Sequence, residues 1–137
     1  MLSDSPLIIR HDITIHFYSS KLKTMKEFLL LFRTDYDKVS KASAEQAEAM
    51  TKKWMDWLGG VAAQNKLASK GNRLQSSGRI VKSDNIVTNG PYTDIKESIG
   101  GYTIIKAHNY EEAVEIAKGC PVLLAGGSVE VREIDVL

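Results

Sequence analysis

Residues 89–102 read NGPYTDIKESIGGY, with turn residues and charges at spacings that ordinary helix or strand patterning does not require. Asn89 and Gly90 tolerate a positive φ, and Pro91 fixes the φ that follows. The pair Gly100–Gly101 allows another backbone to approach closely where a new strand begins. The stretch therefore predicts a shaped loop that leads into a strand, and it leaves open what that loop binds.

This loop is similar to the signature of the YCII-related family in its DGPF branch, where Asp-Gly-Pro-Phe is followed by a Lys-Glu pair and then by Gly-Gly-Tyr. Two further segments fit that branch in the same order, KEFLLLF at residues 26–32 and CP at 120–121 followed by GSVEVR at 127–132. The resemblance runs from about Met25 to the C-terminus. The chain departs from the branch where Asn89 replaces the Asp and Tyr92 replaces the Phe. Because an amide does not titrate, an acid–base role of that Asp would not carry over to Asn89.

Length and charge indicate one ordinary domain. The 137 residues include 18 Lys and Arg against 17 Asp and Glu. A chain of this length can bury a core without disulfide or metal staples. The charges are interleaved without a basic stripe, so we expect no direct contact with nucleic acid. Cys120 is the single cysteine, which is typical of the reducing cytoplasm, and we expect a cytoplasmic protein.

Residues 1–24 lie outside the resemblance, and we treat them as an N-terminal extension of a YCII-related domain at residues 25–137. Two interpretations of the extension stay open. It is upstream sequence translated from an early start codon, since Met25 directly precedes the first family-like strand, or residues 13–18 form an added edge strand, because apolar and polar residues alternate there.

The extension does not resemble an export signal. Its apolar run at residues 7–9 is interrupted at once by Arg-His-Asp at residues 10–12. Elsewhere the sequence has no run of about 18 apolar residues, so we expect no membrane-spanning helix.

Periodicity predicts a first strand and a long helix. Residues 26–32 place apolar side chains on both faces of a strand, which is typical of a strand covered on both sides. Ser43 begins a capping box, and apolar residues follow at helical spacing, so we expect an amphipathic helix that ends near Asn65. Gly59–Gly60 inside it costs about 1 kcal/mol per residue relative to Ala, and we expect a tight contact with the sheet or a local bend there.

The second half predicts a hairpin from Arg73 to Tyr92 that turns around residues 83–85, a strand at 101–107, a helix at 110–118 capped by Asn109, and a strand at 128–136. The order is β-α-β-β-α-β with a hairpin elaboration, the ferredoxin-like arrangement of an α+β fold. Two helices on one face leave the other face of the sheet bare, and a homodimer with stacked sheets would cover it. The resemblance implies the same assembly, a dimeric α+β barrel.

Candidate ligand-binding residues come from the signature and from strand ends. The signature supplies Asn89, Pro91, Tyr92, Lys96, Glu97 and Tyr102. Arg33, Asp35 and Tyr36 follow the first strand, at an end where ligands often collect. Arg132 and Glu130 point to the bare face if their neighbours face the helices. The structural alternatives are a solvated loop, surface charges, core-edge aromatics and an internal salt bridge between Glu130 and Arg132.

Several kinds of site are absent from the sequence. The histidines are His11, His16 and His108, and no metal cluster can be built from them, so we expect no metal. Glycine-rich nucleotide-binding motifs are missing, and we expect no cofactor. Other family branches are proposed to use a His-Asp pair, but the family-like part of this chain has no histidine in a predicted strand, and we assign no catalytic residue. We interpret Trp54, Trp57 and Cys120 as packing residues.

Two functions stay open, with the first slightly favoured. The fold relatives include monooxygenases, isomerases and lyases, so the resemblance implies a small-molecule site in the barrel or dimer cleft, either for binding or for catalysis. It also implies a non-catalytic accessory module, because DGPF-type proteins are often encoded near, or fused to, extracytoplasmic-function sigma factors. The link to transcription would then be a protein contact rather than a DNA contact.

Overall fold

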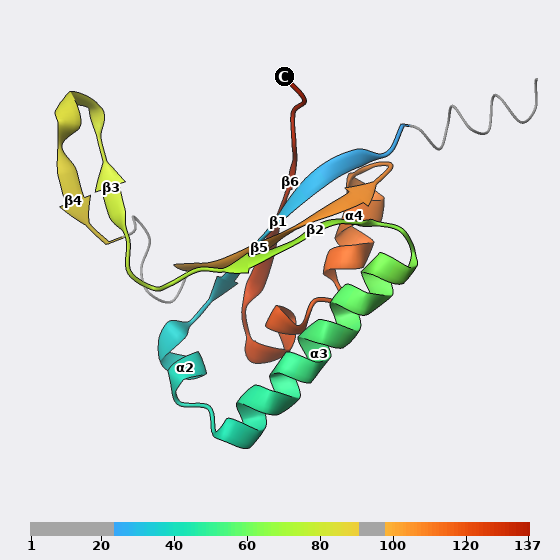
Figure 1. The fold of residues 1–137 in the computed structure, drawn as a ribbon, viewed down its shortest axis with the longest axis horizontal. Helices are drawn as coiled ribbons and strands as arrows, with labels where there is room; N and C mark the ends of the chain where they lie inside the picture. Colours follow the sequence, from blue (N-terminus) through green and yellow to red (C-terminus); the bar gives the residue numbers. More distant parts are fainter. Residues whose placement is uncertain (1–23, 91–97) are drawn as a thin grey trace, which may run out of the picture.

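A computed structural model describes residues 24–90 and 98–137 as a mixed α+β fold. Its main sheet is antiparallel and has the strand order β2-β5-β1-β6. The four strands are β1 (Lys26–Thr34), β2 (Leu67–Arg73), β5 (Ser98–Ala107) and β6 (Ser128–Glu133). A separate two-stranded sheet pairs β3 (Arg79–Val81) with β4 (Val87–Asn89), around the 3₁₀ helix η1 (Ser83–Asn85). The helices lie on one side of the main sheet (Figure 1).

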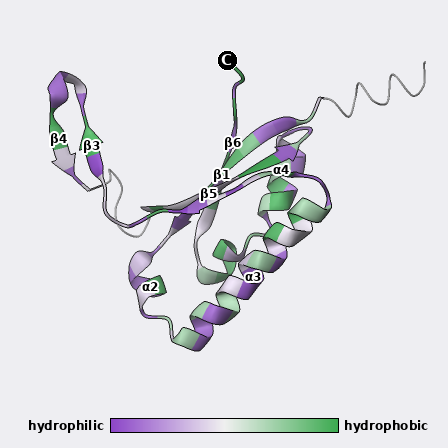
Figure 2. Cartoon of the chain, viewed as in Figure 1, coloured by the Kyte–Doolittle hydropathy of each residue, from purple (hydrophilic) through white to green (hydrophobic). Residues whose placement is uncertain are grey.

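The described residues form three α-helices, α2 (Tyr36–Ser40), α3 (Ala44–Ala63) and α4 (Tyr110–Ala117), and a second 3₁₀ helix, η3 (Pro121–Ala125). The predicted capping box is confirmed, because Ser43 and Gln46 each accept the other's backbone N–H. Asn109 caps α4 by accepting the N–H of Glu112. Figure 2 shows hydrophilic and hydrophobic bands alternating along α3, as an amphipathic helix requires. No helix of the described ranges is long and apolar enough to cross a bilayer.

The core lies between the main sheet and the helices α3, α4 and η3. Phe28, Leu30 and Ile105 are fully buried on that side of the sheet. The rings of Trp54 and Trp57 pack edge-on against Phe32, with centroids 4.9 and 6.2 Å away. Cys120 is buried in the same cluster, where burial raises the pKa of its thiol to about 12. These contacts confirm the packing role predicted for both tryptophans and for Cys120.

The opposite side of the sheet, which we call the bare face, carries half-buried apolar side chains. Leu31 lies between Tyr102 and Glu130 in the strand register, and Leu29 lies between Ile104 and Arg132. No described helix covers this face (Figure 1). Both sides of β1 are therefore apolar, but only one is packed within the described chain.

Four features of the structure differ from what the sequence predicted. The strand β2 was not predicted, and neither was the short helix α2. The last strand ends at Glu133 instead of residue 136; the Ile134 N–H still donates to the Glu27 carbonyl oxygen before the chain leaves the sheet. Gly59–Gly60 makes no tight contact with the sheet, because a Cβ built on either glycine meets no atom within 4 Å, and the local bend expected as the alternative stays a prediction. Residues 1–23 lie outside the described residues, so both interpretations of the extension stay open.

Candidate functional site

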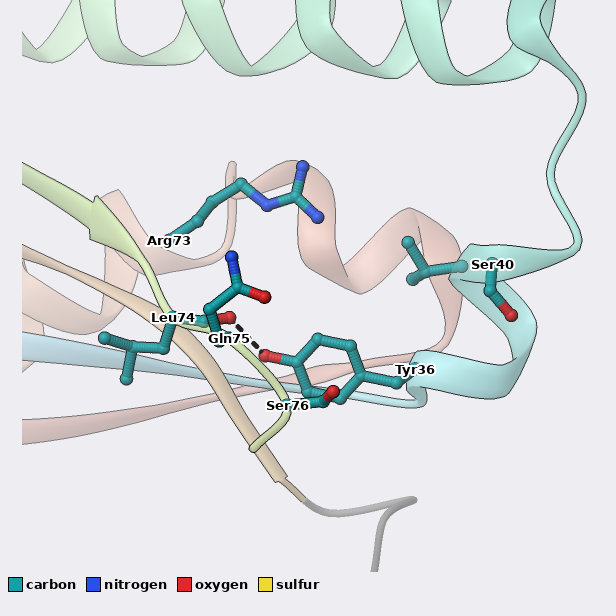
Figure 3. Close-up of a pocket in the computed structure, with 7 residues that line it drawn as sticks. Tyr36, Ser40, Arg73, Leu74, Gln75 and Ser76 are labelled. Atoms are coloured by element: carbon teal, nitrogen blue, oxygen red, sulfur yellow. Dashed lines mark hydrogen bonds between the residues drawn. The ribbon is translucent and has the colours of Figure 1, made fainter. Parts of the chain in front are cut away.

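A hollow of about 480 Å³ lies between α2 and the chain that leaves β2 (Figure 3). It is lined by Tyr36, Val39 and Ser40 on one side and by Arg73, Leu74, Gln75 and Ser76 on the other. The Tyr36 hydroxyl donates a hydrogen bond of 2.6 Å to the Leu74 carbonyl oxygen and so joins the two walls. Figure 3 shows the polar ends of Arg73 and Gln75 on the same side of the Tyr36 ring.

The first wall is placed by a tight helix start directly after β1. The Asp35 carboxylate accepts the backbone N–H groups of Asp37 and Lys38, at 3.0 and 3.4 Å, and thereby caps α2. This cap turns the chain as soon as β1 ends. Tyr36 is therefore held at the rim of the sheet rather than within a strand.

The second wall is placed by the glycines of the signature. The Leu74 N–H donates to the Gly100 carbonyl oxygen at 2.9 Å. A Cβ on Gly101 would lie 2.8 Å from the Asn72 carbonyl oxygen, so a larger residue would push the end of β2 away. Gly71, with a φ of 68°, fits against β5 from the other side, where a Cβ would overlap the Tyr102 carbonyl oxygen. These close approaches fix the position from which Arg73 enters the hollow.

The donors of the hollow are unequally available. The Tyr36 hydroxyl already donates to Leu74, and the Ser40 hydroxyl donates to the Asp37 carbonyl oxygen at 3.0 Å. Within residues 24–90 and 98–137, no carboxylate lies within ion-pair distance of Arg73. The guanidinium of Arg73, the amide of Gln75 and the hydroxyl of Ser76 are therefore the side-chain donors of the hollow that can meet a ligand. A fixed positive charge with adjacent N–H donors suits a carboxylate or a phosphate.

On the bare face, two predicted site residues meet through a carboxylate. Arg33 Nη2 donates to Glu130 Oε1 at 3.0 Å, and Arg132 Nη1 donates to Glu130 Oε2 at 3.3 Å. The hydrogen bond from Arg33, and then that from Arg132, hold the pKa of Glu130 below its usual value. The structure thus contains the internal ion pair that the sequence left as the alternative to a ligand site. The Tyr102 hydroxyl lies on the same face and accepts a hydrogen bond from Asn72 at 3.3 Å.

The signature residues do not converge on the hollow in the described part of the chain. Asn89 ends β4, where it pairs with Arg79 in the hairpin and is exposed. Pro91, Tyr92, Lys96 and Glu97 lie outside the described residues. Of the predicted ligand-binding residues that the structure describes, Tyr36 is the one that lines the hollow.

A second polar cluster was missed by the sequence reasoning. His108 Nδ1 lies 2.9 Å from Glu112 Oε2, and Lys66 Nζ lies 3.0 Å from Glu112 Oε1. That Oε1 is buried and accepts no well-directed hydrogen bond, so its contact with Lys66 is ionic. The hydrogen bond with His108, more than the contact with Lys66, lowers the pKa of Glu112 against the opposing effect of burial. The signal in the sequence was the four-residue spacing from His108 to Glu112 at a helix start.

This cluster links the chain after α3 to the start of α4, and nothing in it is arranged as a metal site. Across the two described ranges, no group of three His, Cys, Asp or Glu side chains could hold a metal ion. We therefore interpret the cluster as a structural tie between two helices.

Comparison with known proteins gives the family. No curated protein matches the chain. The family model for the YCII-related domain matches residues 27–136. The matched segment includes β1 from its second residue, both walls of the hollow, the signature glycines and β6. Since the match spans most of the sequence and every element that builds the candidate site, the chain belongs to the YCII-related domain family.

Proposed function

We propose that this protein binds a small anionic molecule, a carboxylate or a phosphate, in the hollow between α2 and the end of β2. The position of Arg73 carries the proposal. Its guanidinium has no carboxylate partner among the described residues, and it enters a hollow whose walls are tied together by Tyr36. A volume of about 480 Å³ is within the range of small-molecule sites.

The lining also limits the ligand's shape. Arg73 and Gln75 offer N–H donors on one side of the Tyr36 ring (Figure 3). Val39 and Leu74 add partly exposed apolar surface to the same hollow. An anionic head with a short apolar part would use both kinds of wall, since the guanidinium binds the head and the aliphatic groups leave water on contact.

The test compares one arginine in the hollow with one outside it. Acetate, butyrate, benzoate and inorganic phosphate are titrated against wild type, Arg73→Gln and Arg79→Gln, with thermal unfolding as the readout. A ligand at about 100 times its Kd stabilises the folded state by about 2.7 kcal/mol. We expect at least one anion to raise the Tm of wild type and Arg79→Gln but not of Arg73→Gln. Equal shifts in all three proteins, or no shift with any of these anions, would contradict the proposal.

Assembly is a second proposed function, supported by the bare face. Leu29, Leu31 and Ile104 form an apolar row there with no cover from the described chain. We propose that two copies stack through these faces, which would make the chain a dimeric α+β barrel of the DGPF branch with a ferredoxin-like subunit. The strand order β2-β5-β1-β6 and the antiparallel pairing support this arrangement. Sedimentation equilibrium of wild type and Leu31→Glu measures it, with a dimer expected for the first and a monomer for the second.

Both tests also bear on the alternative that the protein is a non-catalytic accessory module. A dimer that binds none of the anions would favour a protein-contact role, and capture from the native cell would then show whether a sigma factor is retained. A dimer that binds an anion through Arg73 would favour the ligand site.

A further inference from the structure

The β3–β4 hairpin is not expected to be stable in water on its own. Within the part of the chain that the structure describes, its two strands pair only with each other, in the register Arg79–Asn89, Ile80–Thr88 and Val81–Val87. A lone two-stranded hairpin is at best marginally stable in water, unless a further surface packs against it. Val81 and Val87 form a cross-strand aliphatic pair and remain 69% and 59% exposed, and Ile86 beside them is 53% exposed. The hairpin therefore presents β-branched side chains that need a cover.

The direction of the hairpin indicates where that cover comes from. In Figure 1 the helices lie below the main sheet, whereas the hairpin leaves the end of the sheet and rises above it, on the side of the bare face. The last residues of the chain leave the sheet on that side too, and Val136 is almost fully exposed. A second molecule stacked on the bare face would therefore have the hairpin beside it.

The size of the bare face leads to the same conclusion. Its strands have 9, 7, 10 and 6 residues. With about 3.3 Å per residue and about 4.8 Å between strands, the plan area of the face is about 500 Å². A stable interface buries about 800 Å² on each partner. The flat outline of the sheet is no larger than a small interface, and the exposed aliphatic side chains of the hairpin are an adjacent surface that can enlarge it.

We propose that the β3–β4 hairpin is an arm that docks on a second copy of this chain, with Val81, Ile86 and Val87 against the partner. The inference rests on the stacked dimer proposed above. In a two-fold symmetric pair each copy gives one arm and receives one, so every substitution in the arm acts twice. The arm extends an interface that the sheet begins, and the assembled pair covers the aliphatic pair that stays exposed among the described residues of one copy.

Sedimentation equilibrium separates the arm from the sheet face. The proteins are wild type, the double variant Val81→Asp/Val87→Asp, and the control Leu124→Asp, which changes an aliphatic side chain 68% exposed in η3 on the helical side. For the arm variant we expect the dimer Kd to rise on the order of tenfold or more, because two charges are placed twice in an apolar contact. For the control we expect the Kd of wild type.

The outcomes distinguish the two proposals. A wild-type dimer whose Kd is unchanged in the arm variant would overturn the docking of the arm and leave the stacked dimer standing. A wild type that stays monomeric at every concentration would overturn both. Near-ultraviolet circular dichroism from Trp54 and Trp57 checks that the arm variant keeps its core.

A second measurement needs no substitution. Hydrogen exchange of residues 79–89 is compared at protein concentrations above and below the measured dimer Kd. We expect slower exchange of these amides in the dimer, since a docked hairpin opens less often. Equal exchange at both concentrations would also overturn the docking of the arm.

Discussion

Gly71→Ala should lower the free energy of unfolding by about 3 kcal/mol or more, and the estimate follows from two features of β2. A φ of 68° costs an alanine about 1 to 2 kcal/mol. Its Cβ would also overlap the Tyr102 carbonyl oxygen, which is part of the β5 backbone and cannot rotate away. The two strands must then separate locally, and each strand hydrogen bond lost costs about 1 kcal/mol.

The same substitution in α3 supplies the control, because its expected effect has the opposite sign. Gly59 and Gly60 lie inside the helix with open space around a Cβ. Gly59→Ala and Gly60→Ala should each raise the free energy of unfolding by about 1 kcal/mol, through helix propensity alone. Urea denaturation followed by the fluorescence of Trp54 and Trp57 measures all three variants.

The Gly71 prediction extends to binding and can be refuted in two steps. Because β2 carries Arg73 into the hollow, displacement of β2 should also weaken the Arg73-dependent binding of the anion. If the free energy of unfolding of Gly71→Ala lies within about 0.5 kcal/mol of the wild-type value, which is the size of an ordinary surface effect, the close fit of β2 against β5 is wrong. If it is strongly destabilised but binds the anion normally, the close fit of Gly71 against β5 does not position Arg73.

Three further predictions concern single side chains. Tyr36→Phe removes the hydrogen bond to Leu74, so it should destabilise by about 1 kcal/mol in urea denaturation and lower anion affinity in the same titrations used for Arg73. Glu112→Gln should be less stable than wild type at pH 7. The folded-state pKa of Glu112 is lowered, so the carboxylate's contribution to stability is present above the ordinary glutamate pKa and is lost as the pH falls through the folded pKa. The stability curves of the variant and wild type, plotted against pH, should therefore converge below about pH 4. Curves that stay parallel would contradict the role of His108. Cys120 should resist iodoacetamide at pH 8 in the folded protein and react once urea unfolds it, and rapid labelling of the folded chain would show that its burial is wrong.

Strong local signals allowed the sequence to predict the elements they control. The capping box at Ser43 and the cap at Asn109 mark the starts of two helices, because each of their hydrogen bonds joins residues less than four positions apart in the sequence. The strand β2 gave no such signal. Its sequence, LASKGNR, is polar, does not alternate and contains Gly71, and it becomes a strand through pairing with β5. A strand that forms only through pairing with a neighbouring strand cannot be predicted from its own residues.

The candidate site was only partly predictable for the same reason. Tyr36 was found because it follows a clear strand, a local observation. Arg73 stood only at the start of a predicted hairpin, and its place opposite Tyr36 depends on the pairing of β2 with β5 and on the cap at Asp35. His108 and Glu112 could have been found from their spacing, but Lys66 joins them only in the fold.

The glycines Gly100 and Gly101 have a consequence for how proteins with this signature differ from one another. They set the path of the backbone beside β2 and place no functional group in the hollow. In the binding site proposed above, side chains such as Arg73 and Gln75, which lie outside the signature, would select the ligand. A protein could therefore keep the signature intact and change its ligand by substitution at those two positions, so the signature alone is a poor guide to the molecule that is bound.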